Sequence, residues 1–79
     1  MDEVEFFNKI FDIATCNDLQ VESDLKRQVP TLNFFSPKGL PIQIYCESGE
    51  IEISTPTCSE FHWHYDTAIR SIIFLIHCY

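Results

Sequence analysis

The stretch from Glu60 to Asp66, EFHWHYD, combines two histidines and two acids with three aromatic residues. Imidazole nitrogens and carboxylate oxygens are donor atoms that zinc and manganese sites use. His62 and His64 are two positions apart, so on a strand they share a face, with Asp66 next in the row. The spacing permits a small metal-binding site of His62, His64 and Asp66. The sequence offers no further ligand at a diagnostic spacing, and we expect no resident metal.

Catalysis at this stretch would pair the thiol of Cys46 or Cys58 with one of the two histidines. The chain carries no glycine-rich nucleophile turn, phosphate loop or paired-carboxylate pattern to support such a site. A chain of 79 residues also leaves little room for a ligand pocket, which occupies roughly 300–1,000 Å³ in most proteins. The sequence therefore predicts no catalytic residues, no enzymatic activity and no cofactor.

The charge of the chain is strongly negative and unevenly placed. Twelve acids oppose five bases, for a formal net charge of −7 at pH 7. No lysine or arginine occurs between Lys38 and Arg70, whereas five acids fall there: Glu47, Glu50, Glu52, Glu60 and Asp66. Nucleic acids and anionic membranes are bound through lysine and arginine, so neither is an expected partner. A basic protein partner is favoured, although net charge also serves simply to keep a small domain soluble.

The cysteines and the apolar runs bear on the compartment. Cys16, Cys46, Cys58 and Cys78 include no Cys-x-x-Cys pair, which argues against the common zinc and redox spacings. The opening MDEVEFF is acidic and develops no long apolar run, so we expect no signal peptide. The longest apolar run, Ile72 to Ile76, is far shorter than the ~18 residues of a membrane span. We expect a cytoplasmic chain with reduced thiols.

Two helices are predicted at the ends of a single domain, residues 1–79, because a chain of this size supports one core. From Asp2 to about Cys16 apolar residues recur every three or four positions after an acidic first turn, and Asn17-Asp18 ends the pattern. Near the C-terminus, Asp66 or Thr67 is expected to cap a helix. Its apolar stripe is Ile69, Ile72, Ile73 and Ile76.

The middle of the chain predicts an antiparallel sheet. Residues 31–35, 42–47 and 50–55 read as strands, and Ser48-Gly49 suits a two-residue hairpin turn. Residues 19–29 are ambiguous between a strand and a short helix at 23–28, which we favour. The expected fold class is α+β: an N-terminal helix, an antiparallel three- to four-stranded meander, and a C-terminal helix packed on one sheet face.

The last predicted strand, residues 61–65, places the histidines on the outer surface. Alternation would turn Phe61, Trp63 and Tyr65 toward the core and the histidines with Asp66 outward, beside acids of the preceding hairpin. Such a surface can recognise lysine and arginine on a partner, with Tyr45 as an aromatic anchor. The predicted partner-binding residues are Tyr45, Glu47, Glu50, Glu52, Glu60, His62, His64 and Asp66.

From Ile42 to Ile76 the order of motifs is two alternating strands around SGEIEI, then FHWHYD, then an amphipathic helix. This order resembles small bacterial toxin-immunity proteins of the contact-dependent growth inhibition type. The resemblance implies a small cytoplasmic inhibitor, without enzymatic activity, that neutralises a basic toxin nuclease by tight binding. The acidic composition equally suits a phage-encoded anti-CRISPR or other anti-defence inhibitor, and the two alternatives stay open.

Overall fold

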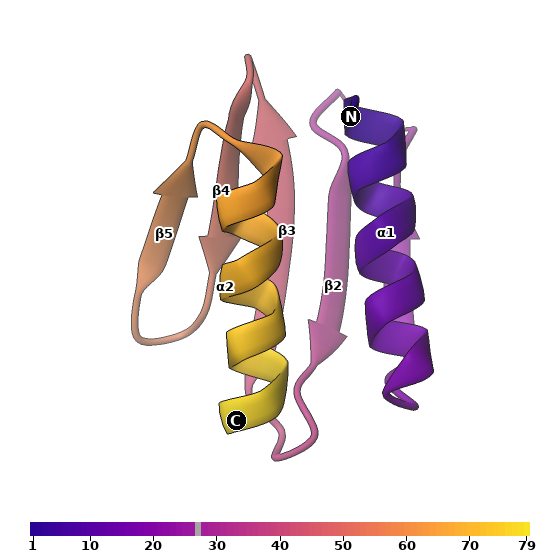
Figure 1. Ribbon diagram of the computed structural model, residues 1–79, viewed down its shortest axis with the longest axis vertical. Helices are drawn as coiled ribbons and strands as arrows, with labels where there is room; N and C mark the ends of the chain where they lie inside the picture. The colour runs from indigo at the N-terminus through magenta and orange to yellow at the C-terminus, as the bar shows by residue number, and fades with distance from the viewer. Residues whose placement is uncertain (27) are drawn as a thin grey trace.

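The computed structural model describes residues 1–26 and 28–79, and it has one helix at each end of the chain, with the five strands of a single sheet between them in sequence (Figure 1). The elements are α1 (Glu3–Cys16), β1 (Val21–Asp24), β2 (Thr31–Phe35), β3 (Pro41–Glu47), β4 (Glu50–Ser54), β5 (Ser59–His62) and α2 (Tyr65–Cys78). Neighbouring strands are antiparallel and follow chain order across the sheet. The expected α+β fold is confirmed. In the described part of the chain, every helix falls short of the length and apolarity that spanning a bilayer requires.

Helix α1 begins and ends as its sequence predicts. The Asp2 carboxylate accepts the backbone N–H of Glu5 at 2.8 Å, which satisfies one of the free donors of the first turn. At the other end the Asn17 side chain donates to the carbonyl of Ile13 at 2.7 Å, and Asp18 takes a left-handed φ of 61°. Polar side chains thus satisfy backbone groups at both ends of α1.

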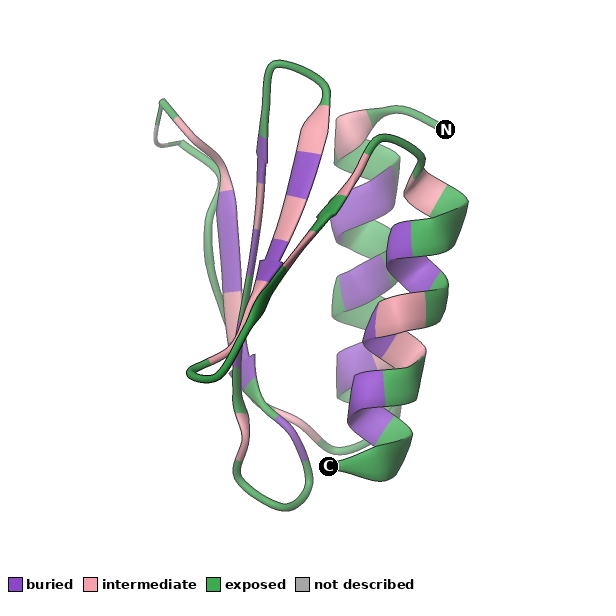
Figure 2. Ribbon diagram, turned by 90° about the vertical axis from the view of Figure 1, so that its left-hand side faces the viewer, coloured by how far each residue is buried: buried purple, intermediate pink, exposed green. Residues whose placement is uncertain are grey.

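Both helices lie on the same side of the sheet, and the core fills the space between the helices and the sheet (Figure 2). Strands β3 and β4 alternate strictly, so that Ile42, Ile44, Ile51 and Ile53 are buried under the helices. From the helices the core receives Phe6, Phe7, Ile10, Ala68, Ile69, Ile72, Leu75 and Ile76. Neither helix of the described chain lies on the opposite side of the sheet, which we call the open face.

The hairpin between β3 and β4 follows from its turn residues. Ser48 and Gly49 have φ values of 53° and 82°, the left-handed pair that a tight two-residue turn requires. This turn sets the register in which Glu47 lies opposite Glu50 and Tyr45 opposite Glu52. The predicted two-residue turn is confirmed.

The short helix expected at residues 23–28 is wrong where the chain is described, while residue 27 lies outside the described residues. Val21–Asp24 instead forms β1, which pairs with the outer edge of β2 in the register Val21 opposite Phe34. Pairing satisfies backbone groups of both strands. Leu25, one of the residues on which the helix was predicted, follows β1 and is exposed. The meander therefore has five strands rather than three or four.

The strand expected at 61–65 is misplaced, and its two faces are exchanged. Strand β5 ends at His62 and α2 starts at Tyr65, so Trp63 lies in the connection and is 67% exposed. Phe61 pairs with Glu52 on the open face, whereas His62 pairs with the core residue Ile51 on the helix side. The register with β4 decides this orientation.

The cap and the first turn of α2 also differ from the prediction. His64, rather than Asp66 or Thr67, is the N-cap, and its side chain makes no capping hydrogen bond. Tyr65 reaches the core as expected, but from the first turn of α2 rather than from a strand. Its ring centroid lies 5.0 Å from that of Phe6 in α1.

Candidate functional site

The open face is rich in carboxylates at its strand positions. None of the strand residues on it is a lysine or an arginine, while β1, β3 and β4 all contribute acids. These strand positions are Glu22, Asp24, Thr31, Asn33, Phe35, Pro41, Gln43, Tyr45, Glu47, Glu50, Glu52, Ser54, Ser59 and Phe61. The face therefore presents negative charge without neutralising strand neighbours.

The charge is concentrated beside the β3–β4 turn, in a group we call the acidic end: Tyr45, Glu47, Glu50 and Glu52. Glu47 and Glu50 are direct cross-strand partners. Like charges directly opposite each other destabilise an antiparallel pair. The hairpin therefore holds its two carboxylates together against their mutual repulsion.

Tyr45 and Glu52 are joined across the same two strands. The Tyr45 hydroxyl donates a hydrogen bond to Glu52 Oε2. This hydrogen bond, then burial, then the charges of Glu52 and Glu47 raise the pKa of Tyr45 above its ordinary value. Phe61 lies on the other side of Glu52 in the register, so two aromatic residues flank this carboxylate. The acidic end thus combines negative charge with aromatic surface.

Replacing Glu52 by glutamine should lower the pKa of Tyr45 toward its ordinary range. A neutral amide is a weaker acceptor for the hydroxyl and removes the charge that opposes tyrosinate formation. Titration of tyrosinate absorbance measures the effect, and Tyr45→Phe identifies which of the tyrosine transitions belongs to this residue. An unchanged transition in Glu52→Gln would show that the two side chains are not coupled.

At the opposite end of the open face lies a hollow of about 560 Å³. Its wall includes the amide side chains of Asn33 and Gln43, together with Phe35 and Pro41. Glu22 also lines it. The open face therefore changes along the strands from a charged end to an end dominated by amide and apolar groups.

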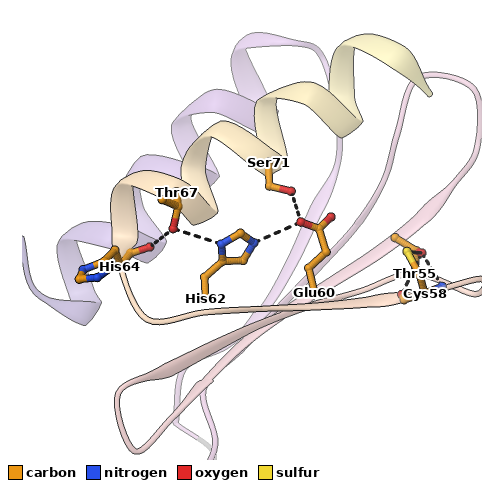
Figure 3. A network of polar contacts seen from close by, with 7 residues as sticks. All are labelled: Thr55, Cys58, Glu60, His62, His64, Thr67 and Ser71. Carbon is orange, nitrogen blue, oxygen red and sulfur yellow. Dashed lines mark hydrogen bonds and ion pairs between the residues drawn. The ribbon is translucent and has the colours of Figure 1, made fainter.

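Glu60 and His62 of β5 lie on the helix side of the sheet and form a polar network with α2 (Figure 3). Glu60 Oε1 accepts from Ser71 Oγ at 2.6 Å and lies 3.2 Å from His62 Nε2. His62 Nδ1 lies 3.1 Å from Thr67 Oγ1. The network spans the space between the edge strand β5 and the first turns of α2, and so fastens one to the other.

The order Thr67, His62, Glu60 resembles a nucleophile, a base and a carboxylate, but its hydrogens run differently. The Thr67 hydroxyl donates to the carbonyl of His64 at 3.0 Å, so its oxygen accepts from the His62 ring. An activated nucleophile would instead give its proton to the imidazole. All contacts are satisfied when both ring nitrogens of His62 carry hydrogen, so that Nδ1 donates to Thr67 Oγ1 and Nε2 donates to Glu60 Oε1. The arrangement suits fastening better than nucleophilic attack.

His62→Ala should lower the free energy of unfolding by about 1 kcal/mol, because Glu60 and Thr67 each lose a hydrogen-bond partner and only the Ser71–Glu60 contact still joins β5 to α2 in this network. His64→Ala is the matched control, since the His64 side chain is exposed and makes no capping hydrogen bond. Urea denaturation of both variants measures the difference. Equal losses in the two variants would contradict a fastening role for His62.

The thiols are all free, and they differ in reactivity. Burial, then the charge of Glu3, raises the pKa of Cys46 to about 12. Because the thiolate is the reactive form, Cys46 is a poor nucleophile at neutral pH. The exposed Cys58 contacts Thr55, with 3.6 Å between Sγ and Oγ1. Neither thiol contacts a histidine in the described part of the chain, so the predicted Cys–His alternative gains no geometric support.

A thiol reagent should label Cys16, Cys58 and Cys78 in the folded protein and Cys46 only after unfolding. A group whose pKa is raised by folding stabilises the protein below its unfolded pKa, and this contribution is lost as the pH rises above it. The Cys46 contribution to stability should therefore fall from about pH 9 toward 12. Mass spectrometry of labelled peptides reads out the order, and rapid labelling of Cys46 under native conditions would contradict its burial.

The predicted binding residues divide between two surfaces. Tyr45, Glu47, Glu50 and Glu52 come together on the open face. The other four do not join them: Glu60 and His62 face the helix side, His64 is the N-cap of α2, and Asp66 lies in its first turn. The predicted outward row of His62, His64 and Asp66 is therefore wrong. Within residues 1–26 and 28–79, histidine, cysteine, aspartate and glutamate side chains form no group of three or more that could hold a metal ion.

Sequence reasoning missed several residues of the open face, among them Glu22, Asp24 and Phe61. Glu22 and Asp24 join it through β1, and the strand alternative for residues 19–29 would have placed them there. Phe61 joins it through the register of β5, for which the sequence holds no clear signal.

Comparison with protein-family models, curated proteins and solved structures yields no match. What the chain does must be inferred from its own charge and geometry.

Proposed function

We propose that this chain is a small, non-enzymatic inhibitor whose open face binds a basic, nucleic-acid-processing protein. The observation that carries the proposal is the acidic end: Tyr45, Glu47, Glu50 and Glu52 lie together on the sheet face opposite α1 and α2. Complementary charge on a partner accelerates encounter and disfavours wrong partners. A protein that binds phosphates through lysine and arginine presents the matching surface.

The facing pair of Glu47 and Glu50 favours recognition over mere solubility. Solubility needs net charge, which any exposed position can supply. Two carboxylates opposite each other destabilise the hairpin, and no strand neighbour on the open face relieves them with a positive charge. A partner with lysine or arginine over this pair would turn the local repulsion into attraction.

The aromatic residues beside Glu52 supply the second component of an interface. Tyr45 is half-buried and Phe61 is 56% exposed, and both neighbour the Glu52 carboxylate in the register. A guanidinium group can pair with a carboxylate while its plane stacks on an aromatic ring. Arginine on the partner is therefore the side chain that this part of the face fits best.

An immunity protein against a toxin nuclease is the form of this role that we favour, acting in the cytoplasm with its thiols reduced. The alternative is a phage-encoded anti-CRISPR or other anti-defence inhibitor, which would use the same chemistry against a different nuclease. The identity of the captured partner separates the two forms: a toxin for the first, a defence nuclease for the second.

The test is capture of the partner from the native host with tagged chain as bait, followed by titration of the purified partner. We expect its activity to fall linearly and to be lost near one equivalent of chain. Bait carrying Glu47→Lys and Glu50→Lys should retain much less partner. Equal retention by this variant would exclude the acidic end as the docking surface, and partner activity that survives excess chain would exclude inhibition.

A further inference from the structure

The hollow and the acidic end lie at opposite ends of the same strands, and the strand register fixes the distance between them. Pro41 and Phe35 are cross-strand partners beside the hollow, and Gln43 pairs with Asn33 in the next row. The following rows are Tyr45 with Glu52 and then Glu47 with Glu50. Rows on one face are two residues apart, or about 6.8 Å. The hollow at Pro41 therefore lies roughly 14 Å from the Tyr45 row and roughly 20 Å from the Glu47 row.

The hollow has groups that suit a peptide segment. Phe35 is 62% exposed and, with Pro41, gives it an apolar wall. The side-chain amides of Asn33 and Gln43 have no hydrogen-bond partner among the described residues, and each can both donate and accept. Apolar surface beside free amides can receive an apolar side chain and also bond the backbone that carries it.

We propose that the partner docks through one extended segment that lies along β3. An apolar side chain of this segment enters the hollow, and basic side chains four and six residues away lie over the Tyr45–Glu52 and Glu47–Glu50 rows. An extended segment rises by about 3.4 Å per residue, so these separations match roughly 14 and 20 Å. Even spacing places all three side chains on the same side of the segment. This inference rests on the proposed function and specifies its partner.

The apolar side chain distinguishes the proposed segment from an arbitrary polycation. A polycation without the apolar residue would meet only the acidic end and would be screened by salt. Burial of the apolar side chain adds a contribution that salt does not screen, and the hollow of about 560 Å³ has room for a phenylalanine side chain.

Three seven-residue peptides test the inference. The first has phenylalanine at position one and arginines at positions five and seven, with serine or threonine elsewhere. The second has serine in place of the phenylalanine. The third moves the phenylalanine to position two, which turns it away from the face in an extended segment. Each peptide is titrated into ¹⁵N-labelled protein at low salt, and binding is followed by the amide shifts of Gln43 and Glu50.

We expect the first peptide to bind about tenfold more tightly than the other two, a difference of about 1.4 kcal/mol. It should shift both amides, whereas the second should shift mainly Glu50. Gln43→Trp fills the hollow and should remove the advantage of the first peptide over the second. Equal affinity of all three peptides at the acidic end would overturn this inference and leave the proposed function standing. Failure of every arginine peptide to shift Glu50 at millimolar concentration would overturn both.

Discussion

Replacing both Glu47 and Glu50 with lysine is expected to slow association with a basic partner by about 10- to 1,000-fold at low ionic strength. The two carboxylates face each other beside the hairpin turn and contribute much of the negative charge at the acidic end. Their reversal turns steering into repulsion. Stopped-flow association with the captured partner at several salt concentrations measures the effect, which should shrink as salt rises because screening weakens steering.

A control with the same change in net charge isolates the position of the two glutamates. Glu5→Lys with Asp12→Lys reverses two exposed acids on α1, away from the open face. This control should change the association rate much less than the open-face variant. If both double variants slow association equally, net charge rather than the acidic end controls encounter.

Single replacement of Glu47 separates stability from docking. Glu47→Lys places a lysine opposite Glu50, so a repulsive cross-strand pair becomes attractive. We expect the free energy of unfolding to rise by a few tenths to about 1 kcal/mol while association slows. In the double variant two lysines face each other, and stability should stay near that of the original chain.

Phe6→Ala is expected to lower the free energy of unfolding by about 3–5 kcal/mol. The Phe6 side chain is fully buried, and its ring contacts Phe7 in α1 and Tyr65 in α2, with centroids 5.6 and 5.0 Å away. Small domains have total stabilities of roughly 5–15 kcal/mol, so this one cavity removes a large fraction. Because the helices and the sheet share one core, unfolding of the helices would also unfold the sheet that forms the open face.

The matched control for Phe6 is Phe11, which lies on the same helix and is 44% exposed. Phe11→Ala should cost less than about 1 kcal/mol, because little apolar surface is uncovered and no cavity forms. Phe6→Leu provides an intermediate variant that retains the fold. In urea denaturation, Phe11→Ala should be the most stable of the three variants, Phe6→Leu should be intermediate and Phe6→Ala should be the least stable. Comparable losses for Phe6→Ala and Phe11→Ala would contradict the packing of α1 on the sheet.

The elements with strong periodicity could be predicted from the sequence. Strict alternation across residues 42–47 and 50–54, with the turn at Ser48-Gly49, placed Tyr45, Glu47, Glu50 and Glu52 on one face. The stripe of α2 identified its buried side, with Ile69, Ile72 and Ile76 all in the core. The stripe of α1 did so in part, because Ile10 and Ala14 are buried whereas Phe11 is exposed. These patterns are local, because a repeat of two or of 3.6 residues is visible without knowledge of the partner element.

The misplaced residues depend on pairings that the sequence does not display. Strand β1 has only four residues, and pairing with β2 decides its conformation. In β5 the aromatic alternation of Phe61, Trp63 and Tyr65 suggested a core face. Pairing with β4 and the early start of α2 place Phe61 outside and His62 inside.

The most direct test of the central claim is carboxyl labelling of the chain alone and in complex with its captured partner. Carbodiimide-driven coupling of a small amine, read by mass spectrometry, reports the accessibility of each carboxylate. Docking through the acidic end predicts that labelling of Glu47, Glu50 and Glu52 falls on complex formation, while that of Glu5 and Asp12 on α1 is unchanged. Protection of Glu5 and Asp12 with unchanged labelling at the acidic end would contradict it.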